Sequence, residues 1–406
     1  MKILFSVVVL KGIGGIESSL LNLLNNLNSP EYDIDICVIG NYISEITQIP
    51  KHINIIKGNR IIEYCCTEYA DLKKYLNRYQ LVCAATVKVI KKLVGYRKIL
   101  KLCLPFMKIQ GEYDVAISYL NDKYLDVYSG GCDDFIKECV TAKRKIAWIH
   151  NDARQHGLTH SICIHKYEGF DYIVNVSQGC KKIFDEIVPE YEYKSRVVTN
   201  MLDLSGICLK KSEYSPYHND CFNIVTVARI ENRQKRIDRV IEVCEMLKES
   251  GVENFRWTIV GDGEDLHTLI ESAQSKKLLD CIDFIGRKSN TIPYMQHADL
   301  FVQTSDYEAY SMVLIEALSV GCPCVVTNYD SAENIITNGE NGWIVDRNAR
   351  AIYEKVLEII NQPELLYGIH EKCIKSCEDL NLKAINSFRE LLGVDNEKTY
   401  CNSNNR

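Results

Sequence analysis

Short apolar runs alternate with helical patterns along the first half of the chain. A helical pattern begins at Glu17, and the apolar runs are Ile3–Leu10, Ile34–Ile39, Val115–Tyr119, Lys145–Ile149 and Tyr172–Val176. This alternation predicts a parallel sheet that is covered by helices on both faces. The ligands of such sheets bind at the carboxyl ends of the strands.

The same rhythm restarts in the second half, after a polar break at Lys210–Pro216. The strands predicted there are Asn223–Val227, Arg256–Val260, Cys281–Ile285, Leu300–Gln303 and Pro323–Thr327. The pattern therefore predicts two doubly wound α/β domains with a cleft between them, each of ordinary domain size. We expect an N-terminal domain over residues 1–204, a C-terminal domain over residues 205–380, and a last helix with a polar tail over residues 381–406.

The amino-acid composition argues against several classes of protein. With 46% hydrophobic and 25% charged residues among 406, the chain is an ordinary globular protein. Its net charge of −6 argues against a nucleic-acid partner. The 18 cysteines include no C-x-x-C pair, so we expect reduced, buried thiols and no zinc or redox site. No apolar stretch reaches the roughly 18 residues of a membrane-spanning helix, and we expect a cytoplasmic protein.

Positive charge is concentrated in one stretch of the N-terminal half. From Lys73 to Gly111 there are ten Lys or Arg residues and no Asp or Glu, which leaves −16 on the remaining chain. Residues 88–102 interleave cations with apolar pairs at helical spacing, before Pro105 ends the pattern. A helix of this kind can lie on an anionic membrane surface. A solvated helix whose apolar side packs on the N-terminal sheet fits the same pattern.

A glycine-rich turn from Gly12 to Glu17 follows the first predicted strand. Gly14 and Gly15 would let the backbone approach a ligand, and the helix after them offers free N–H groups to an anion. Glu17 stands where the dinucleotide fingerprint G-x-G-x-x-G requires its last glycine, which argues against a nucleotide-dependent oxidoreductase. A tight structural turn explains the glycines equally well.

Two cations follow the first strand of the C-terminal half. Arg229 lies just past Asn223–Val227, and Lys235 stands at the start of the next helical pattern. Cations at the mouth of a parallel strand are well placed to clamp a diphosphate through charge-assisted hydrogen bonds.

Two carboxylates bracket a segment that passes from a loop into a helix. Glu308 and Glu316 are eight residues apart, which on a helix is a rotation of about 80° and a rise of about 12 Å. At that spacing they could contact the sugar and the ribose of one elongated ligand. The N–H groups of Tyr310 and Ser311, at the predicted helix start, could bind phosphate oxygens.

Taken in order, these motifs resemble the retaining glycosyltransferases of family 4. The residues that carry the resemblance are Gly14–Glu17, Arg229 with Lys235, Gly261–Glu264, Ala298–Val302, Ser305, and Glu308 with Glu316. The likeness covers nearly the whole chain, weakly in the N-terminal half and strongly from Phe222 to Val345. It implies the GT-B fold, in which two Rossmann-like doubly wound domains face each other across a cleft.

The resemblance implies a role for each matching residue. Arg229 and Lys235 would hold the donor diphosphate, Glu308 the hydroxyls of the donor sugar, and Glu316 the ribose. His150 resembles the family's N-domain histidine near the reacting sugar, although a lone histidine can equally be structural. The remaining residues of the expected site are Gly14 and Gly15 across the cleft, Gly261, Gly263 and Arg287 near the nucleoside, and Tyr310 and Ser311 at the phosphates.

The expected activity is retaining transfer of a hexose or N-acetylhexosamine from a nucleotide sugar, which we expect to be UDP-linked. No side chain in the motifs is an obvious nucleophile, so the family's same-face attack is favoured, with the leaving β-phosphate taking the acceptor proton. We expect no cofactor and no metal, because the D-x-D at Asp33 and Asp35 lies in a strand pattern.

The basic stretch bears on the acceptor and on where the protein acts. A membrane-facing helix would suit a lipid-diphosphate-linked glycan, such as an undecaprenyl-diphosphate intermediate of capsule or O-antigen, at the inner face of the cell membrane. The alternative function is a noncatalytic GT-B partner subunit, which the absence of Arg229, Lys235 or Glu308 would favour. All three residues are present.

Overall fold

The computed structural model describes residues 1–11, 14–44, 47–120, 122–124, 130–211, 214–217 and 220–394. The chain forms two compact units: unit 1 comprises Met1–Met201 and the chain from Ile385 on, and unit 2 comprises Leu202–Ala384. The predicted domain ends at residues 204 and 380 lie three and four residues from these divisions. Most of the predicted polar tail and the start of the glycine-rich turn, Gly12, lie outside the described residues.

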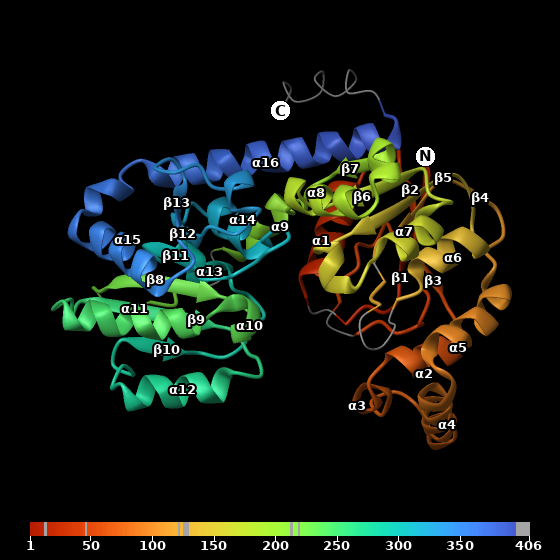
Figure 1. Ribbon diagram of the computed structural model, residues 1–406, viewed down its shortest axis with the longest axis horizontal. Helices are drawn as coiled ribbons and strands as arrows, with labels where there is room; N and C mark the ends of the chain where they lie inside the picture. The colour runs from red at the N-terminus through yellow and green to blue at the C-terminus, as the bar shows by residue number, and fades with distance from the viewer. Residues whose placement is uncertain are drawn as a thin grey trace. The chain divides into compact units, whose positions relative to one another are not determined.

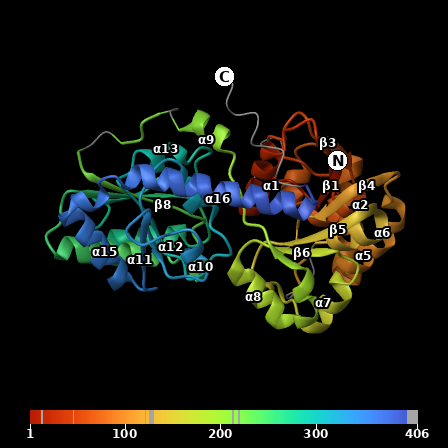
Figure 2. The same cartoon turned by 90° about the horizontal axis from the view of Figure 1, so that it is seen from above.

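Unit 1 contains a parallel sheet of seven strands, with helices on its faces (Figure 1 and Figure 2). Its strand order is β3-β2-β1-β4-β5-β6-β7. The strands are β1 (Lys2–Val7), β2 (Asp33–Val38), β3 (Asn54–Lys57), β4 (Glu112–Ser118), β5 (Thr141–Ile149), β6 (Tyr172–Asn175) and β7 (Ser195–Val197). The α-helices are α1 (Gly15–Asn26), α2 (Arg60–Cys66), α3 (Tyr69–Leu72), α4 (Arg78–Val94), α5 (Tyr96–Cys103), α6 (Cys132–Cys139), α7 (His160–Tyr167) and α8 (Gln178–Ile187). The 3-10 helices are η1 (Leu104–Met107), η2 (Ala153–His156) and η3 (Pro189–Lys194).

Unit 2 contains a parallel sheet of six strands in the order β10-β9-β8-β11-β12-β13. The strands are β8 (Phe222–Val227), β9 (Phe255–Val260), β10 (Ile282–Phe284), β11 (Leu300–Gln303), β12 (Cys324–Thr327) and β13 (Gly342–Val345). The α-helices are α9 (Leu204–Lys210), α10 (Asn232–Lys235), α11 (Asp238–Glu249), α12 (Leu266–Ser275), α13 (Ile292–Gln296), α14 (Met312–Ser319), α15 (Ala349–Asn361) and the first part of α16 (Ile369–Leu392), whose residues from Ile385 on belong to unit 1. The 3-10 helices are η4 (Ala332–Asn334) and η5 (Pro363–Leu366). Helices α11 and α15 pack together on one face of the sheet, and α13 lies on the other (Figure 2), where it packs against α14.

Each sheet reverses its direction of growth at one point. In unit 1 the reversal lies between β1 and β4, and in unit 2 it lies between β8 and β11. At such a switch point the loops from the two strands diverge and leave room at their carboxyl ends for a ligand. The two parallel α/β domains predicted from the hydrophobic pattern are therefore confirmed, and each has its own switch point.

Three strands were not predicted, namely β3, β7 and β13. Each lies at an edge of its sheet. Strand β3 is largely exposed and β7 is three residues long, so neither forms the continuous apolar run of a buried parallel strand.

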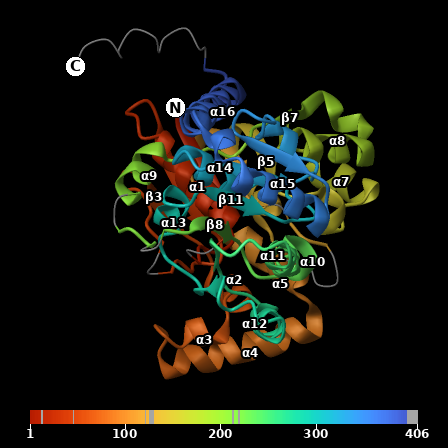
Figure 3. The same ribbon diagram turned by 90° about the vertical axis from the view of Figure 1, so that its left-hand side faces the viewer.

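The basic stretch folds as two helices and not as the single predicted one. Gly95 takes a positive φ of 83° and separates α4 from α5. Helix α5 buries Tyr96, Ile99, Leu100 and Cys103, whereas α4 buries only Ala84. Helix α4 projects away from the sheet of unit 1 (Figure 1 and Figure 3).

Asp33 and Asp35 lie in β2, as predicted. Asp35 accepts hydrogen bonds from the Tyr113 hydroxyl at 2.5 Å and from the Asn54 amide at 2.9 Å, so its role is structural. The described cysteines are free thiols, and most are buried. Among the described helices, none is both long and apolar enough to cross a membrane.

Candidate active site

The switch point of unit 2 brings together the loops that follow β8 and β11. Arg229 follows β8, and its guanidinium is largely exposed and paired with Glu231 at 2.6 Å. Lys235 is the last residue of the short helix α10, and it lies two residues before Ile237, the N-cap of α11, which is the helix predicted after it. Its side chain extends to the loop after β11.

Lys235 Nζ forms an ion pair with Glu308 Oε1 at 2.6 Å. The two side chains are only 16% and 8% exposed, so the charges compensate each other in a volume that is partly withdrawn from water. Glu308 Oε1 also accepts hydrogen bonds from Ser305 Oγ at 2.7 Å and from Gln303 Nε2 at 3.1 Å. Two of the predicted catalytic residues are therefore in direct contact.

Glu308 lies in the loop before α14, and only Glu316 lies on that helix. The predicted geometry for Glu308 and Glu316, taken from eight residues of helix, is therefore wrong. The loop is shaped by Gln303, whose amide bonds both Glu308 and the Ser311 hydroxyl, and this turns the Glu308 carboxylate back toward β11.

The segment that carries Lys235 is fixed to the β11 loop by its main chain. Thr304 Oγ1 donates to the carbonyl of Lys235 at 2.7 Å, and the N–H of Asp306 donates to the carbonyl of Gln234 at 2.9 Å. Arg236 adopts a left-handed conformation with φ of 52°, which is costly for a residue with a Cβ. Its guanidinium bonds Asp306 Oδ2 at 3.1 Å, and the two arginines Arg236 and Arg239 together lower the pKa of the Asp306 carboxyl.

Tyr310 and Ser311 precede α14, as predicted, and both are buried. Ser311 is the N-cap of this helix, but its hydroxyl accepts from Gln303 and makes no side-chain capping bond. Glu316 is half-buried on the second turn, where burial raises its pKa to about 7 and the positive charge of Lys210 opposes that shift. Glu316 therefore titrates near neutral pH.

Gly261 and Gly263 follow β9, next to the loop that carries Arg229. A Cβ at Gly261 would lie 1.8 Å from the carbonyl oxygen of Ala228, and one at Gly263 would lie 2.1 Å from that of Ile230. Glycine is therefore required at both positions by the close approach of these two loops. Arg287 is exposed in the loop after β10, at the edge of the sheet.

In unit 1, Gly14 and Gly15 begin α1 beside the switch point. Gly14 is the N-cap with φ of 125°, in the region that favours glycine. A Cβ added at Gly14 or Gly15 would meet nothing within 4 Å. The conformation explains Gly14, and the open space leaves the N-terminus of α1 accessible to an anionic or polar ligand.

His150 follows β5 at the same carboxyl edge of the sheet. Its Nε2 lies 3.0 Å from the carbonyl oxygen of Tyr119, and the Tyr119 hydroxyl lies 2.8 Å from Ser19 Oγ on α1. His150 and the helix that begins at Gly15 are thus linked through one tyrosine. Burial lowers the pKa of His150 to about 3, so the ring is neutral at physiological pH. Because a carbonyl only accepts hydrogen bonds, Nε2 carries the proton and Nδ1 has the lone pair.

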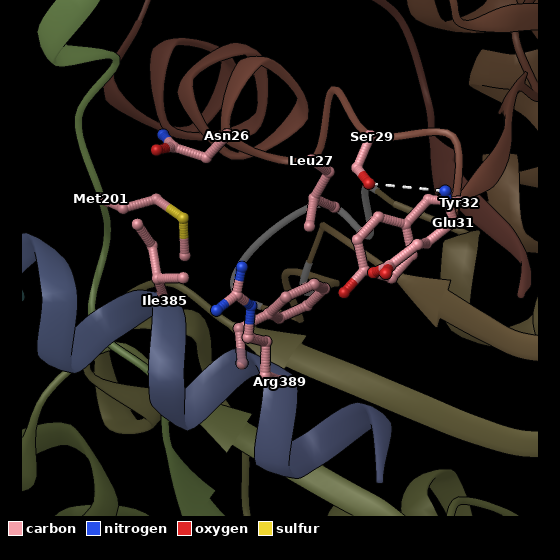
Figure 4. A pocket seen from close by; sticks show the side chains of 9 residues that line it. Asn26, Leu27, Ser29, Glu31, Tyr32, Met201, Ile385 and Arg389 are labelled. Atoms are coloured by element: carbon pink, nitrogen blue, oxygen red, sulfur yellow. Dashed lines mark hydrogen bonds between the residues drawn. The ribbon is translucent and has the colours of Figure 1, made fainter. Parts of the chain in front are cut away.

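A pocket in unit 1 lies elsewhere, between the end of α1 and α16 (Figure 4). Its lining includes Leu27, Tyr32, Phe388 and Arg389. Leu27 follows the last residue of α1 and Tyr32 precedes β2, so the pocket lies at the amino ends of the strands. It contains none of the predicted site residues and is not the candidate active site.

Of the predicted residues of unit 2, Lys235 contacts Glu308 directly, and Ser311 is joined to it through Gln303. No hydrogen bond or ion pair joins the other predicted charged residues of unit 2 to Glu308 among the described residues, and Gln303, Asp306 and Tyr329 are among the residues of this network that were not predicted. Gln303 ends β11, Asp306 lies in the loop that follows, and Tyr329 lies just past β12. Each is a polar residue at or just beyond the carboxyl end of an apolar strand. This position could have identified the three residues from the sequence, because ligands of parallel sheets bind at the carboxyl ends of the strands.

The chain is similar to known proteins in sequence and in fold. Residues 215–376 match the family described as "Glycosyl transferases group 1". The alpha-monoglucosyldiacylglycerol synthase of Acholeplasma laidlawii is 27% identical over 52% of this chain and 58% of its own length. The Salmonella typhimurium protein named "Putative colanic acid biosynthesis glycosyltransferase WcaL" is 34% identical over 40% of this chain and 42% of its own. A solved structure of Anabaena Alr3699/HepE in complex with UDP covers 97% of this chain and 99% of its own, with a TM-score of 0.66 and 14% identity.

Proposed function

We propose that the chain is a group 1 glycosyltransferase, specifically a retaining transferase that uses a UDP-linked hexose or N-acetylhexosamine. The match of residues 215–376 to that family and the GT-B fold support this proposal. The observation that carries this proposal is the ion pair of Lys235 and Glu308 at the switch point between β8 and β11. A cation and a carboxylate side by side at this position suit a ligand that joins a diphosphate to a sugar. The complex of the HepE structure with UDP supports UDP as the nucleotide.

The proposed role of each residue is the one that the resemblance to the glycosyltransferase family implies. Arg229 and Lys235 bind the diphosphate, and Glu308 accepts hydrogen bonds from the donor sugar. Glu316 accepts from the ribose hydroxyls, and His150, which is neutral, is the residue that the resemblance places near the reacting sugar. Gly261, Gly263 and Arg287 lie near the nucleoside, and the N–H groups of Tyr310 and Ser311 near the phosphates.

The reaction is a same-face displacement. The bond from the anomeric carbon to the β-phosphate oxygen breaks, the acceptor hydroxyl oxygen bonds to that carbon, and the acceptor proton passes to the leaving phosphate. Arg229 and Lys235 stabilise the charge that develops on the diphosphate. No metal takes part, so EDTA leaves turnover unchanged.

We propose a surface polysaccharide as the product and a lipid-linked glycan as the acceptor. The colanic acid biosynthesis relative supports the first part. A surface on α4, α5 and η1 supports the second. Helix α4 leaves a stripe of apolar side chains exposed at Val82, Val89 and Leu93, which recur at helical spacing.

Leu102 and Phe106 are also exposed in this stretch, at 72% and 84%. Five exposed cations accompany these apolar residues: Lys92, Arg97, Lys98, Lys101 and Lys108. We call these cations, together with Val82, Val89, Leu93, Leu102 and Phe106, the α4–η1 surface. On the opposite side of α4, Lys88 and Lys91 donate to the carbonyls of Thr67 and Cys65. The apolar stripe of α4 is thus unpartnered within the described residues of unit 1. Exposed apolar groups among cations suit an anionic membrane surface, so we propose a peripheral protein of the inner membrane face.

A donor screen by thermal shift tests the proposed activity. The full chain is melted with UDP-hexoses, UDP-N-acetylhexosamines and GDP-mannose. A ligand at 100 times its dissociation constant adds about 2.7 kcal/mol of stability, so we expect a clear rise in melting temperature with one UDP-sugar. The absence of a shift with every donor would contradict the proposal. The alternative, a noncatalytic partner subunit, predicts no turnover by the isolated chain in the presence of that donor.

A further inference from the structure

Gln303 is the last residue of β11 and is 4% exposed. Its Nε2 donates to Glu308 Oε1 at 3.1 Å and to Ser311 Oγ at 2.9 Å. Its Oε1 accepts from the Tyr329 hydroxyl at 2.8 Å. A carboxylate can only accept hydrogen bonds, so the side of the amide that faces Glu308 must be the NH2 group. The orientation of the amide is therefore determined at both ends.

Tyr329 remains a donor in this arrangement. It is buried behind Gln303, and burial together with the negative charge of Glu308 raises its pKa well above the ordinary value. Its hydroxyl is therefore protonated at every physiological pH and holds the amide oxygen.

The two oxygens of Glu308 differ in their surroundings. Oε1 accepts from Lys235, Ser305 and Gln303, at 2.6, 2.7 and 3.1 Å. Among the described residues, Oε2 is reached only by Gln234 Nε2, at 3.4 Å. One oxygen is therefore anchored to the protein, and the other is available to a ligand.

We infer that Gln303 is a positioning residue, which anchors Glu308 Oε1 so that Oε2 is presented to the hydroxyls of the donor sugar. This inference rests on the proposed function, because it needs a donor sugar at Glu308. When Lys235 turns to the diphosphate, Ser305 and Gln303 keep the carboxylate in place. Gln303 contributes more to binding of the sugar than to binding of the nucleotide.

The test compares a sugar donor with its free nucleotide. Binding of UDP-glucose, UDP-N-acetylglucosamine and GDP-mannose is measured by calorimetry on the full chain, each beside UDP or GDP. In Gln303→Leu, which has similar size but no donor, we expect affinity for the sugar donor to fall about tenfold, because a hydrogen bond to a charged group is lost. Affinity for the free nucleotide should fall less, because the variant loses only the bond to the Ser311 hydroxyl on that side and keeps the main-chain N–H groups. Tyr329→Phe keeps the ring and releases the amide oxygen, and we expect a smaller loss of the same kind.

Gln303→Glu adds a second measurement, the pH dependence of kcat/KM, which would not change if the role of Gln303 were purely structural. When ionised, the new carboxylate repels Glu308; when protonated, it can donate as the amide did. The ratio of its kcat/KM to that of the wild type should therefore rise as the pH falls from 8 to 6. Equal losses for nucleotide and sugar donor, or a flat ratio with pH, would overturn the role of Gln303. A wild-type chain that binds none of the donors would overturn the proposed function, and the inference with it.

Discussion

Lys235 serves two acidic partners, because its ammonium neutralises Glu308 in the structure and would neutralise a diphosphate in the donor complex. We predict that Lys235→Ala lowers kcat by about 10²–10³, since one stabilising contact to the developing charge is lost. Glu308 keeps its hydrogen bonds from Ser305 and Gln303, so the fold should survive. Steady-state kinetics with the identified donor measures the first effect, and thermal melting the second.

Lys248→Ala is the matched control. It breaks a more exposed lysine–aspartate pair of unit 2, with Asp280, at the C-terminal end of α11. We expect wild-type turnover in this variant. Wild-type turnover in Lys235→Ala as well would refute the assignment of Lys235.

Through Glu316, the free energy of unfolding depends on pH. Its pKa is raised from 4.5 to about 7 in the folded chain, so between these values the folded state binds more protons than the unfolded state. The free energy of unfolding must then decrease as the pH rises through this window. We predict that Glu316→Gln, which stays neutral, raises the melting temperature more at pH 8 than at pH 5. If the substitution changes the melting temperature equally at both pH values, or more at pH 5 than at pH 8, burial does not raise the pKa of the Glu316 carboxyl.

At the scale of elements, two loops act as one unit. The loop after β8 carries Lys235, the loop after β11 carries Glu308, and Asp306 ties them by accepting from Arg236 and Arg239. Arg236 sits in a left-handed conformation that glycine would adopt without cost. A glycine at position 236 keeps the left-handed conformation and removes the ion pair with Asp306, so the two effects can be measured separately.

We predict that Arg236→Gly melts close to the wild type but loses about tenfold in kcat/KM, because the charge-assisted bond that aligns Lys235 is gone. Asp306→Asn should lose a similar amount. Asp283→Asn is the control, because it weakens the Arg256 pair between β9 and β10 at the sheet edge. Full activity in Arg236→Gly would mean that the backbone conformation alone positions Lys235.

The elements also show what the sequence could predict. Buried strands such as β8 and β11 appear as apolar runs, and the polar residues just after them mark the switch point. The edge strand β3 does not appear, because an exposed strand has no apolar run. The separation of Glu308 and Glu316 was predicted with helical geometry, whereas the chain stays in a loop until Ser311. The bond from Gln303 that shapes this loop joins residues on a strand and in a turn, and no periodicity records it.

Charge is segregated at the scale of the whole molecule, with a net charge of −6 and a basic stretch without acidic residues from Lys73 to Gly111. A net negative protein is repelled by an anionic membrane unless its cations are gathered on one surface. The α4–η1 surface gathers them beside exposed apolar side chains. Each basic residue near the membrane contributes about 1 kcal/mol, and each inserted apolar side chain about 1.5–3 kcal/mol.

The electrostatic and the apolar contributions to membrane binding can be separated by added salt and by substitution. We predict that the full chain binds vesicles containing phosphatidylglycerol at low salt and not vesicles of phosphatidylcholine alone. Binding should weaken in 1 M salt, where the screening length falls to about 3 Å. Leu93→Ser should weaken binding already at low salt, because an apolar side chain that would insert is lost. Leu209→Ser is matched to it, since both leucines are about equally exposed, at 79% and 82%, but Leu209 lies in unit 2. Equal effects of the two substitutions, or no binding in flotation at low salt, would exclude the α4–η1 surface as the site of membrane contact.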